Sequence, residues 1–197
     1  MRMPDHAKGG SPACCLILAL CAAAALASPA TAQTRLGIGH AVTPAQIASW
    51  DIDVAPDGKN LPAGKGSVSR GHEIYVAQCA ACHGGQGEGG LGDKLAGGQG
   101  TLATAVPVKT VGSYWPYATT LYDYIRRAMP LTAPQSLSNE DVYAVSAYVL
   151  FLNGLVDEGA VIDAKTLIAL KMPNRDGFVA DPRPDVRDPG CLHECTK

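Results

Sequence analysis

The stretch AQCAACHGGQG, residues 77–87, decides how the rest of the sequence is interpreted. It places Cys79 and Cys82 three positions apart, with His83 directly after them and two glycines behind it. The cysteine spacing alone is compatible with a redox disulfide, with half of a zinc site or with a covalent haem anchor. The neighbouring residues separate these three chemistries.

The flanks of this motif favour a haem anchor. A thioredoxin-like dithiol normally follows a β-strand, whereas residues 68–82 predict a helix that leads into the motif. A structural zinc site would need two more ligands at a similar spacing, and the sequence has no second C-x-x-C. C-x-x-C-H is the signature of c-type haem attachment, in which both thiols form thioethers and the histidine binds iron. The motif therefore predicts one covalent haem c, with Cys79 and Cys82 as anchors and His83 as the proximal ligand.

Composition and the N-terminal residues limit the class of protein. The chain has 197 residues and a net charge of -2, which argues against nucleic acid as a partner. Arg2 and Lys8 precede a short apolar run at 13–27, and the small residues 30–32 follow it. This pattern predicts a secretory signal peptide over residues 1–32 and a periplasmic protein. The run is too short for a membrane span, which disfavours the alternative of an uncleaved anchor.

The sixth iron ligand separates an electron carrier from an open haem site, because a thioether there favours electron transfer. After the signal peptide the sequence offers Met129 and Met172, each followed by a proline. Residues 118–128 predict a short helix, and a longer helix is expected from an N-cap at Ser138 to a stop at 153–154. Met129 lies between these two helices, and Met172 follows the second one.

This order of helix, C-x-x-C-H, glycine-rich loop, helix, methionine and helix resembles the class I cytochromes c. The resemblance implies an all-α fold, with three to four core helices around a covalent haem and with extended N- and C-terminal arms. In that family the ligand methionine precedes the last core helix. The resemblance therefore implies Met129 as the distal iron ligand and leaves Met172 as a residue that packs on the domain.

The same family packs its first and last helices crosswise, through a glycine and an aromatic residue. Gly71 and Tyr75 occupy these places before Cys79, and Val145 and Tyr148 occupy the facing places on the last helix. A glycine suits such a crossing because a missing side chain lets two backbones approach closely.

Two aromatic residues are candidates for the wall of the haem pocket. Trp115 and Tyr117 precede the short helix, and an aromatic side chain there would exclude water while offering a polar edge. Ordinary core packing is the alternative for both. The glycine-rich run 84–100 lacks the lysine and hydroxyl residue of a phosphate-binding loop, so we expect tight turns near the haem edge. The remaining histidines after the signal peptide are not expected to bind iron: His40, His72 and His193.

The sequence divides into a signal peptide (1–32), an N-terminal arm (33–66), a cytochrome c domain (67–154) and a C-terminal extension (155–197). A short helix is expected near residues 164–170 of the extension. Regular structure should end beyond it, because proline, aspartate and arginine dominate there.

Both arms carry scattered apolar residues such as Trp50 and Phe178. Their presence favours arms that lie against the domain or against a partner, because ordering an arm costs conformational entropy. Cys191 and Cys195 are a possible local disulfide if their segment is helical. An interchain bridge, or a ligand site with His193, is the alternative.

The flanks also narrow the family. The stretches TPAQIASWDIDVAPDGKNLPAGKGSV (43–68), AMPLTAPQSLSNEDVYAVSAYVLFLNG (128–154) and KMPNRDGF (171–178), with the closing cysteine pair, resemble the cytochrome c subunit of the bacterial Sox-type sulfur (sulfite) dehydrogenase. In that family the cytochrome pairs with a molybdenum-cofactor subunit that oxidises carrier-bound sulfur or sulfite. Some members carry two haems, whereas the single C-x-x-C-H here implies a monohaem form.

The resemblance implies an electron-transfer subunit with no catalytic residue of its own. It would accept electrons from the molybdenum-cofactor subunit and pass them to a soluble cytochrome c. A general periplasmic shuttle without a fixed partner is the first alternative. An enzyme or sensor with an open haem site is the second, and a dithiol oxidoreductase without haem is the third.

Overall fold

The computed structural model of the protein describes residues 38–182. The predicted signal peptide (1–32) and the cysteines Cys191 and Cys195 lie outside the described residues. The chain divides into two units, Met1–Pro44 and Ala45–Lys197. Of the first unit the structure describes only residues 38–44, which are exposed.

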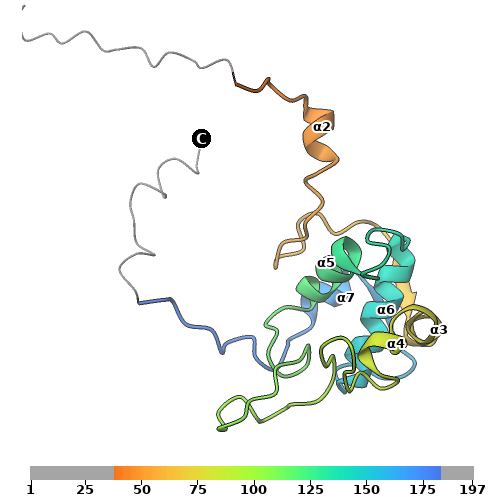
Figure 1. Ribbon diagram of the computed structural model, residues 1–197, viewed down its shortest axis with the longest axis vertical. Helices are drawn as coiled ribbons and strands as arrows, with labels where there is room; N and C mark the ends of the chain where they lie inside the picture. Colours follow the sequence, from red (N-terminus) through yellow and green to blue (C-terminus); the bar gives the residue numbers. More distant parts are fainter. Residues whose placement is uncertain (1–37, 183–197) are drawn as a thin grey trace, which may run out of the picture. The chain divides into compact units, whose positions relative to one another are not determined.

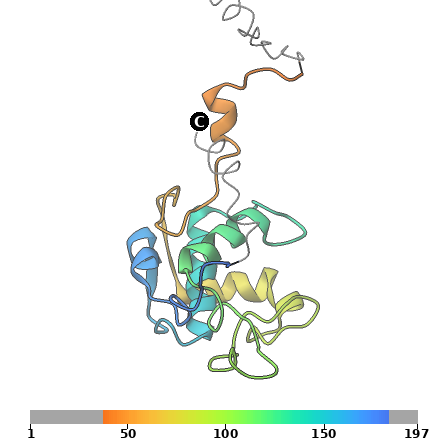
Figure 2. The same cartoon turned by 90° about the vertical axis from the view of Figure 1, so that its left-hand side faces the viewer.

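The folded body is mostly helical (Figure 1). Helix α3 (Val68–Gln78) begins at Ser67, whose hydroxyl accepts a hydrogen bond from the amide of Arg70. The single turn α4 (Ala80–His83) follows and carries the C-x-x-C-H motif. Between α4 and α5 the chain runs through turns without a helix or strand (Figure 2).

Two further helices agree with the sequence prediction. Helix α5 (Ala118–Ala128) has the predicted bounds. Helix α6 (Asn139–Leu152) begins after Ser138, whose hydroxyl accepts from the amide of Asp141. The short helix α2 (Pro44–Ala48) has no buried residue. The regular structure is therefore mainly helical, and these two long helices lie where the sequence predicts them.

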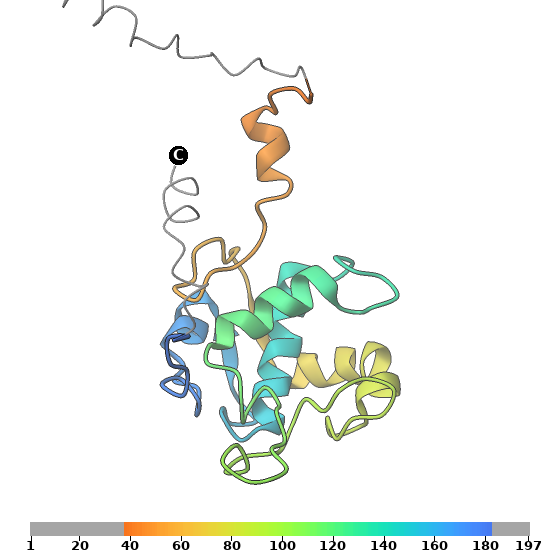
Figure 3. The same ribbon diagram turned by 60° about the vertical axis from the view of Figure 1, so that its left-hand side comes forward.

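Helix α3 crosses α6 at close range (Figure 3). A methyl group added at Gly71 would overlap the carbonyl oxygen of Ala144, so only glycine permits this approach. The rings of Tyr75 and Tyr148 lie 5.1 Å apart at the same crossing. The closest backbone contact of α6 is therefore at Ala144, whereas the predicted contact residue Val145 lines a cavity.

A small sheet, which the all-α prediction does not include, joins the segment before helix α3 to the segment after helix α6. We call these segments the N-terminal flank (residues 45–67) and the C-terminal flank (residues 153–182). Strand β1 (Lys65–Ser67) pairs antiparallel with β2 (Val161–Asp163), with Gly66 opposite Ile162. Strands of three residues are too short to produce a readable alternation of polar and apolar residues. The sheet packs beside α6, so residues on both sides of the central domain belong to one folded unit.

The C-terminal flank continues with helix α7 (Ala164–Ala169), which begins at a capping box between Asp163 and Thr166 and packs against α5. Met172 is 1 % exposed, which agrees with its prediction as a packing residue. In the N-terminal flank Val54 is buried, whereas Trp50 is 85 % exposed and does not pack on the domain. No helix within residues 38–182 is long and apolar enough to cross a membrane.

Candidate haem site

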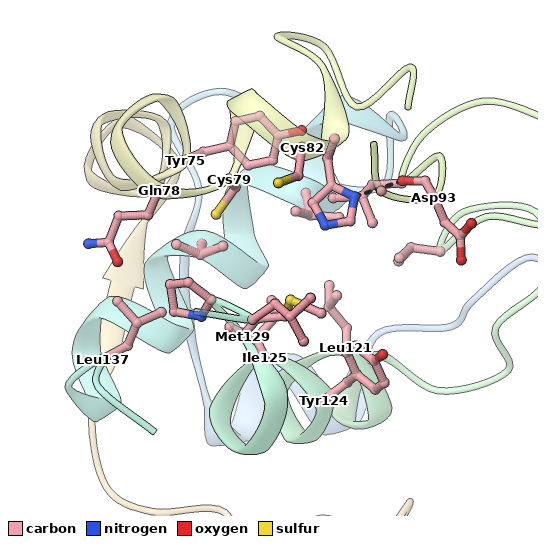
Figure 4. Close-up of a pocket in the computed structure, with 18 of the residues that line it drawn as sticks. Tyr75, Gln78, Cys79, Cys82, Asp93, Leu121, Tyr124, Ile125, Met129 and Leu137 are labelled. Atoms are coloured by element: carbon pink, nitrogen blue, oxygen red, sulfur yellow. Dashed lines mark hydrogen bonds between the residues drawn. The ribbon is translucent and has the colours of Figure 1, made fainter. Parts of the chain in front are cut away.

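A cavity of about 500 Å³ lies between the C-x-x-C-H motif and helices α5 and α6. Its size falls within the usual range of ligand sites. Figure 4 shows Cys79 and Cys82 on one side of it, with Ile125 and Met129 on the opposite side. The lining is mostly apolar and comes from helices α3, α5 and α6 and the loops between them. Its members include Tyr75, Gln78, Leu91, Leu95, Val111, Trp115, Leu121, Tyr124, Leu137, Val145 and Val149.

The helical turn α4 brings the motif together. The amides of Cys82 and His83 both donate to the carbonyl of Cys79, at 3.1 and 3.0 Å. Residues three positions apart on a helix share a face, and both cysteines line the cavity. No disulfide joins them. Burial, and then the neighbouring Cys82, raises the pKa of the Cys79 thiol to about 11. The two sulfurs are therefore free to form thioether bonds.

The ring of His83 is held in a single tautomer by the loop after it. Its Nδ1 atom lies 2.7 Å from the carbonyl oxygen of Asp93. A carbonyl can only accept, so Nδ1 carries the proton and Nε2 keeps its lone pair for a metal. A Cβ atom at Gly92 would lie 2.8 Å from Cε1 of the ring, which explains a glycine at this place. The sequence gives no signal for the Asp93 carbonyl, because every residue carries one.

Tyr75 fixes the end of the motif to helix α3. Its side chain is fully buried, and its hydroxyl donates to the carbonyl of Gly84 at 2.8 Å. Burial is the main cause that raises the pKa of Tyr75 to about 12, and the nearby Cys79 adds to it. The tyrosine predicted for the helix crossing therefore also lines the cavity.

The opposite wall comes from one face of α5. Leu121, Ile125 and Met129 follow one another at intervals of four residues and all line the cavity. The helix ends at Met129, where the backbone becomes extended and the amide donates to the carbonyl of Ile125. Met172 is buried elsewhere and is not among the lining residues that the structure describes.

The two aromatic candidates have different positions. Trp115 lines the cavity, and its ring meets that of Tyr124 edge to face with 5.9 Å between centroids. Within the described residues Tyr117 is not part of the lining; instead the guanidinium of Arg175 lies 4.1 Å from its ring centroid. Tyr124, which the sequence analysis did not single out, lies three residues after Leu121 on the lining face of α5.

The donors around this cavity fit a haem. Two thiols and an imidazole with a free nitrogen stand on one side, a thioether on the other, and apolar side chains between them. These are the groups that attach and ligate a c-type haem. No group of three or more His, Cys, Asp or Glu side chains within residues 38–182 could hold a metal ion directly.

Comparisons with known proteins agree with this chemistry. The family model described as cytochrome C oxidase, cbb3-type, subunit III matches residues 66–149. A chain of the sulfane dehydrogenase SoxCD from Paracoccus pantotrophus is 42% identical, with a TM-score of 0.71 over 80% of this chain and 78% of that one. A thiosulfate dehydrogenase of Stutzerimonas stutzeri (strain A1501) is 31% identical over an alignment of 115 residues, and the match covers 51% of this chain. The matched part covers 35% of that protein.

The chain belongs to the c-type cytochrome family, carries haem c and functions in electron transfer. Within that family it resembles the cytochrome c subunit of the bacterial Sox-type sulfur dehydrogenase, as its flanking sequences predict.

Proposed function

We propose that this chain is the monohaem electron-transfer subunit of a periplasmic sulfur dehydrogenase. Cys79 and Cys82 hold the haem through thioether bonds, and His83 and Met129 are the axial iron ligands. The observation that carries this assignment is the placement of Met129 across one apolar cavity from the two cysteines. The similarity to a chain of a sulfane dehydrogenase supports a role in electron transfer within a sulfur dehydrogenase. Electrons come from a molybdenum-cofactor subunit and leave to a soluble cytochrome c.

When bound, the haem supplies a one-electron iron couple. The chain's own residues would orient the iron ligands and control the access of water. The Asp93 carbonyl holds the His83 ring in the tautomer that can bind iron. The thioether of Met129 would supply the second iron ligand, which would leave no vacant site for exogenous ligands. Leu121, Ile125 and the other apolar lining residues would limit the access of water to the iron, which would favour the less charged, reduced state.

The replacement Met129→Ala tests the ligand assignment. In the ferric holoprotein we expect it to abolish the weak red absorption band that sulfur–iron bonding gives, and in the ferrous protein to allow carbon monoxide binding. Met172→Leu is the matched control, because Met172 is buried away from the cavity, and it should keep the band. A band that persists in Met129→Ala would overturn the ligand assignment.

The partner assignment needs a separate experiment. Purification of the tagged full chain from its source under mild conditions should bring a molybdenum protein with it. A general shuttle would instead be recovered alone, and its reduction would not depend on one particular dehydrogenase. Recovery of the holoprotein without molybdenum would favour the shuttle and leave the haem assignment intact.

A further inference from the structure

Residues 171–178, KMPNRDGF, run across the segment 114–117 that brings Trp115 to the cavity; we name them the C-terminal strap. The Nδ2 atom of Asn174 donates to the carbonyl of Tyr114 at 2.7 Å. The Nη1 atom of Arg175 donates to the carbonyl of Pro116 at 3.5 Å. The strap therefore binds the carbonyls of the residues directly before and after Trp115.

Side-chain packing accompanies these hydrogen bonds. The guanidinium of Arg175 covers the ring of Tyr117 at 4.1 Å, and such contacts between a cation and an aromatic face are attractive. The ring of Phe178 meets that of Tyr114 edge to face, with 5.3 Å between centroids. Two consecutive strap residues and Phe178 thus contact three of the four residues in the segment.

The strap has a built conformation of its own. Met172 anchors it in the core with 1 % of its surface exposed. The amide of Arg175 donates to the carbonyl of Met172 at 3.1 Å, and that of Gly177 donates to the carbonyl of Asn174 at 3.2 Å. A Cβ atom at Gly177 would overlap the amide oxygen of Asn174. The turn therefore holds the Asn174 side chain where it can reach Tyr114.

The segment that carries Trp115 depends on such support because it belongs to no helix or strand. Trp115 is half-buried, lines the cavity and contacts Tyr124. A loop residue keeps its side chain in one place only when neighbouring groups hold its backbone. The hydrogen bonds to the carbonyls on both sides of Trp115 supply that restraint.

We propose that Asn174 and Arg175 are positioning residues for Trp115, and that the C-terminal strap thereby sets how closely the indole covers the haem cavity. This inference rests on the proposed function, because it takes the haem to occupy the cavity that Trp115 lines. Loosening the strap would let water approach the iron, which stabilises the more charged, oxidised state. The expected consequence is a lower reduction potential without loss of the axial ligands.

The fluorescence of Trp115 reports its position. The sequence contains two tryptophans, and Trp50 is exposed, so Trp50→Phe gives a parent protein in which only Trp115 emits. A haem in the cavity should quench this emission strongly. In the parent holoprotein, Asn174→Asp removes the donor to Tyr114 while keeping the size of the side chain. We expect a several-fold rise in emission and a downward shift of the midpoint potential, with the red sulfur–iron band retained.

Two further variants separate positioning from general damage. Gly177→Ala should reproduce both changes, because its methyl group would displace the Asn174 side chain. Asp176→Asn is the matched control, since within residues 38–182 Asp176 pairs with Lys171 at 3.5 Å and both side chains are exposed. It should change neither quantity. Far-UV circular dichroism confirms that each variant keeps its helices.

The possible outcomes are distinct. Unchanged emission and potential in both Asn174→Asp and Gly177→Ala, with haem attached and helices intact, would overturn the role of the strap alone. A parent protein without covalent haem, or without the sulfur–iron band, would overturn the proposed function and the strap with it. Equal effects in Asp176→Asn would also contradict the proposal, because the proposal assigns the support of the segment 114–117 to Asn174 and Arg175.

Discussion

Asp123 joins the N-terminal flank to helix α5. Its replacement should lower the free energy of unfolding, and the size of the loss in different variants shows which contact contributes most. The Asp123 side chain is 11 % exposed. One oxygen accepts from the amide of Val54 at 2.7 Å and from Nε of Arg127 at 2.9 Å. The other oxygen accepts from Nη2 of Arg127. Arg126 adds a bond to the carbonyl of Ile52 at 2.8 Å.

The replacement Asp123→Ala removes two contributions of different size. The amide of Val54 would stay buried without an acceptor, which costs about 1–3 kcal/mol. The ion pair with Arg127 is worth only about 0.5–1 kcal/mol, because 44% of the arginine side chain is exposed and solvent screens it. The total loss should be about 1.5–4 kcal/mol. Asp123→Asn keeps an oxygen for the Val54 amide, so it should lose only the ion-pair share.

Denaturant unfolding of the holoprotein, followed by far-UV circular dichroism, measures these losses. The expected order is a large loss for Asp123→Ala and a small loss for Asp123→Asn. If Asp123→Asn destabilised as much as Asp123→Ala, the buried amide would not be the dominant contact. That result would contradict the prediction, because the exposed ion pair would then contribute more free energy than solvent screening allows.

Two further predictions concern the helix crossing. Gly71→Ala should destabilise by about 1–3 kcal/mol or more, because its methyl group would overlap the Ala144 backbone, although helix propensity alone would favour alanine by about 1 kcal/mol. The exposed Val76→Ala on the same helix is the control, and a stabilised Gly71→Ala would contradict the crossing geometry. The pKa of Tyr75 is raised from 10.0 to about 12, so its contribution to stability is complete below pH 10 and is lost as the pH rises towards about 12. Tyr75→Phe should remove that part of the alkaline loss, and identical pH profiles of the two proteins would count against it.

The parts of the site that side-chain identity encodes were predictable from the sequence. The C-x-x-C-H motif, the methionine after a helix and the N-cap at Ser138 each need a particular residue type at a particular spacing. Helix α5 was predicted with its observed bounds because its apolar residues recur with the helical period.

The parts that depend on backbone atoms or on chain direction were not predictable. The His83 ring is held by the carbonyl of Asp93, and the sheet pairs segments almost a hundred positions apart with three residues each. The position of each tyrosine relative to the helical face of α5 explains why Tyr124 lines the cavity and Tyr117 does not. Tyr117 stands at the N-cap of α5, before the helical face is established, whereas Tyr124 lies within it. Adjacency to Trp115 in the sequence was therefore a poor guide to the lining.

Both flanks attach to elements that line the cavity. These attachments limit where a partner protein can bind without disturbing the site. The N-terminal flank binds α5 through Asp123, and α5 ends at Met129. The C-terminal flank binds the segment of Trp115 through Asn174. A partner that drew either flank away from the domain would have to break these contacts and expose Val54 or Met172, which are buried. Residues 52–54 and 172–174 therefore cannot leave the domain without disturbing elements that line the cavity. A partner that leaves the site intact must bind surfaces that are already exposed, such as the neighbourhood of Trp50.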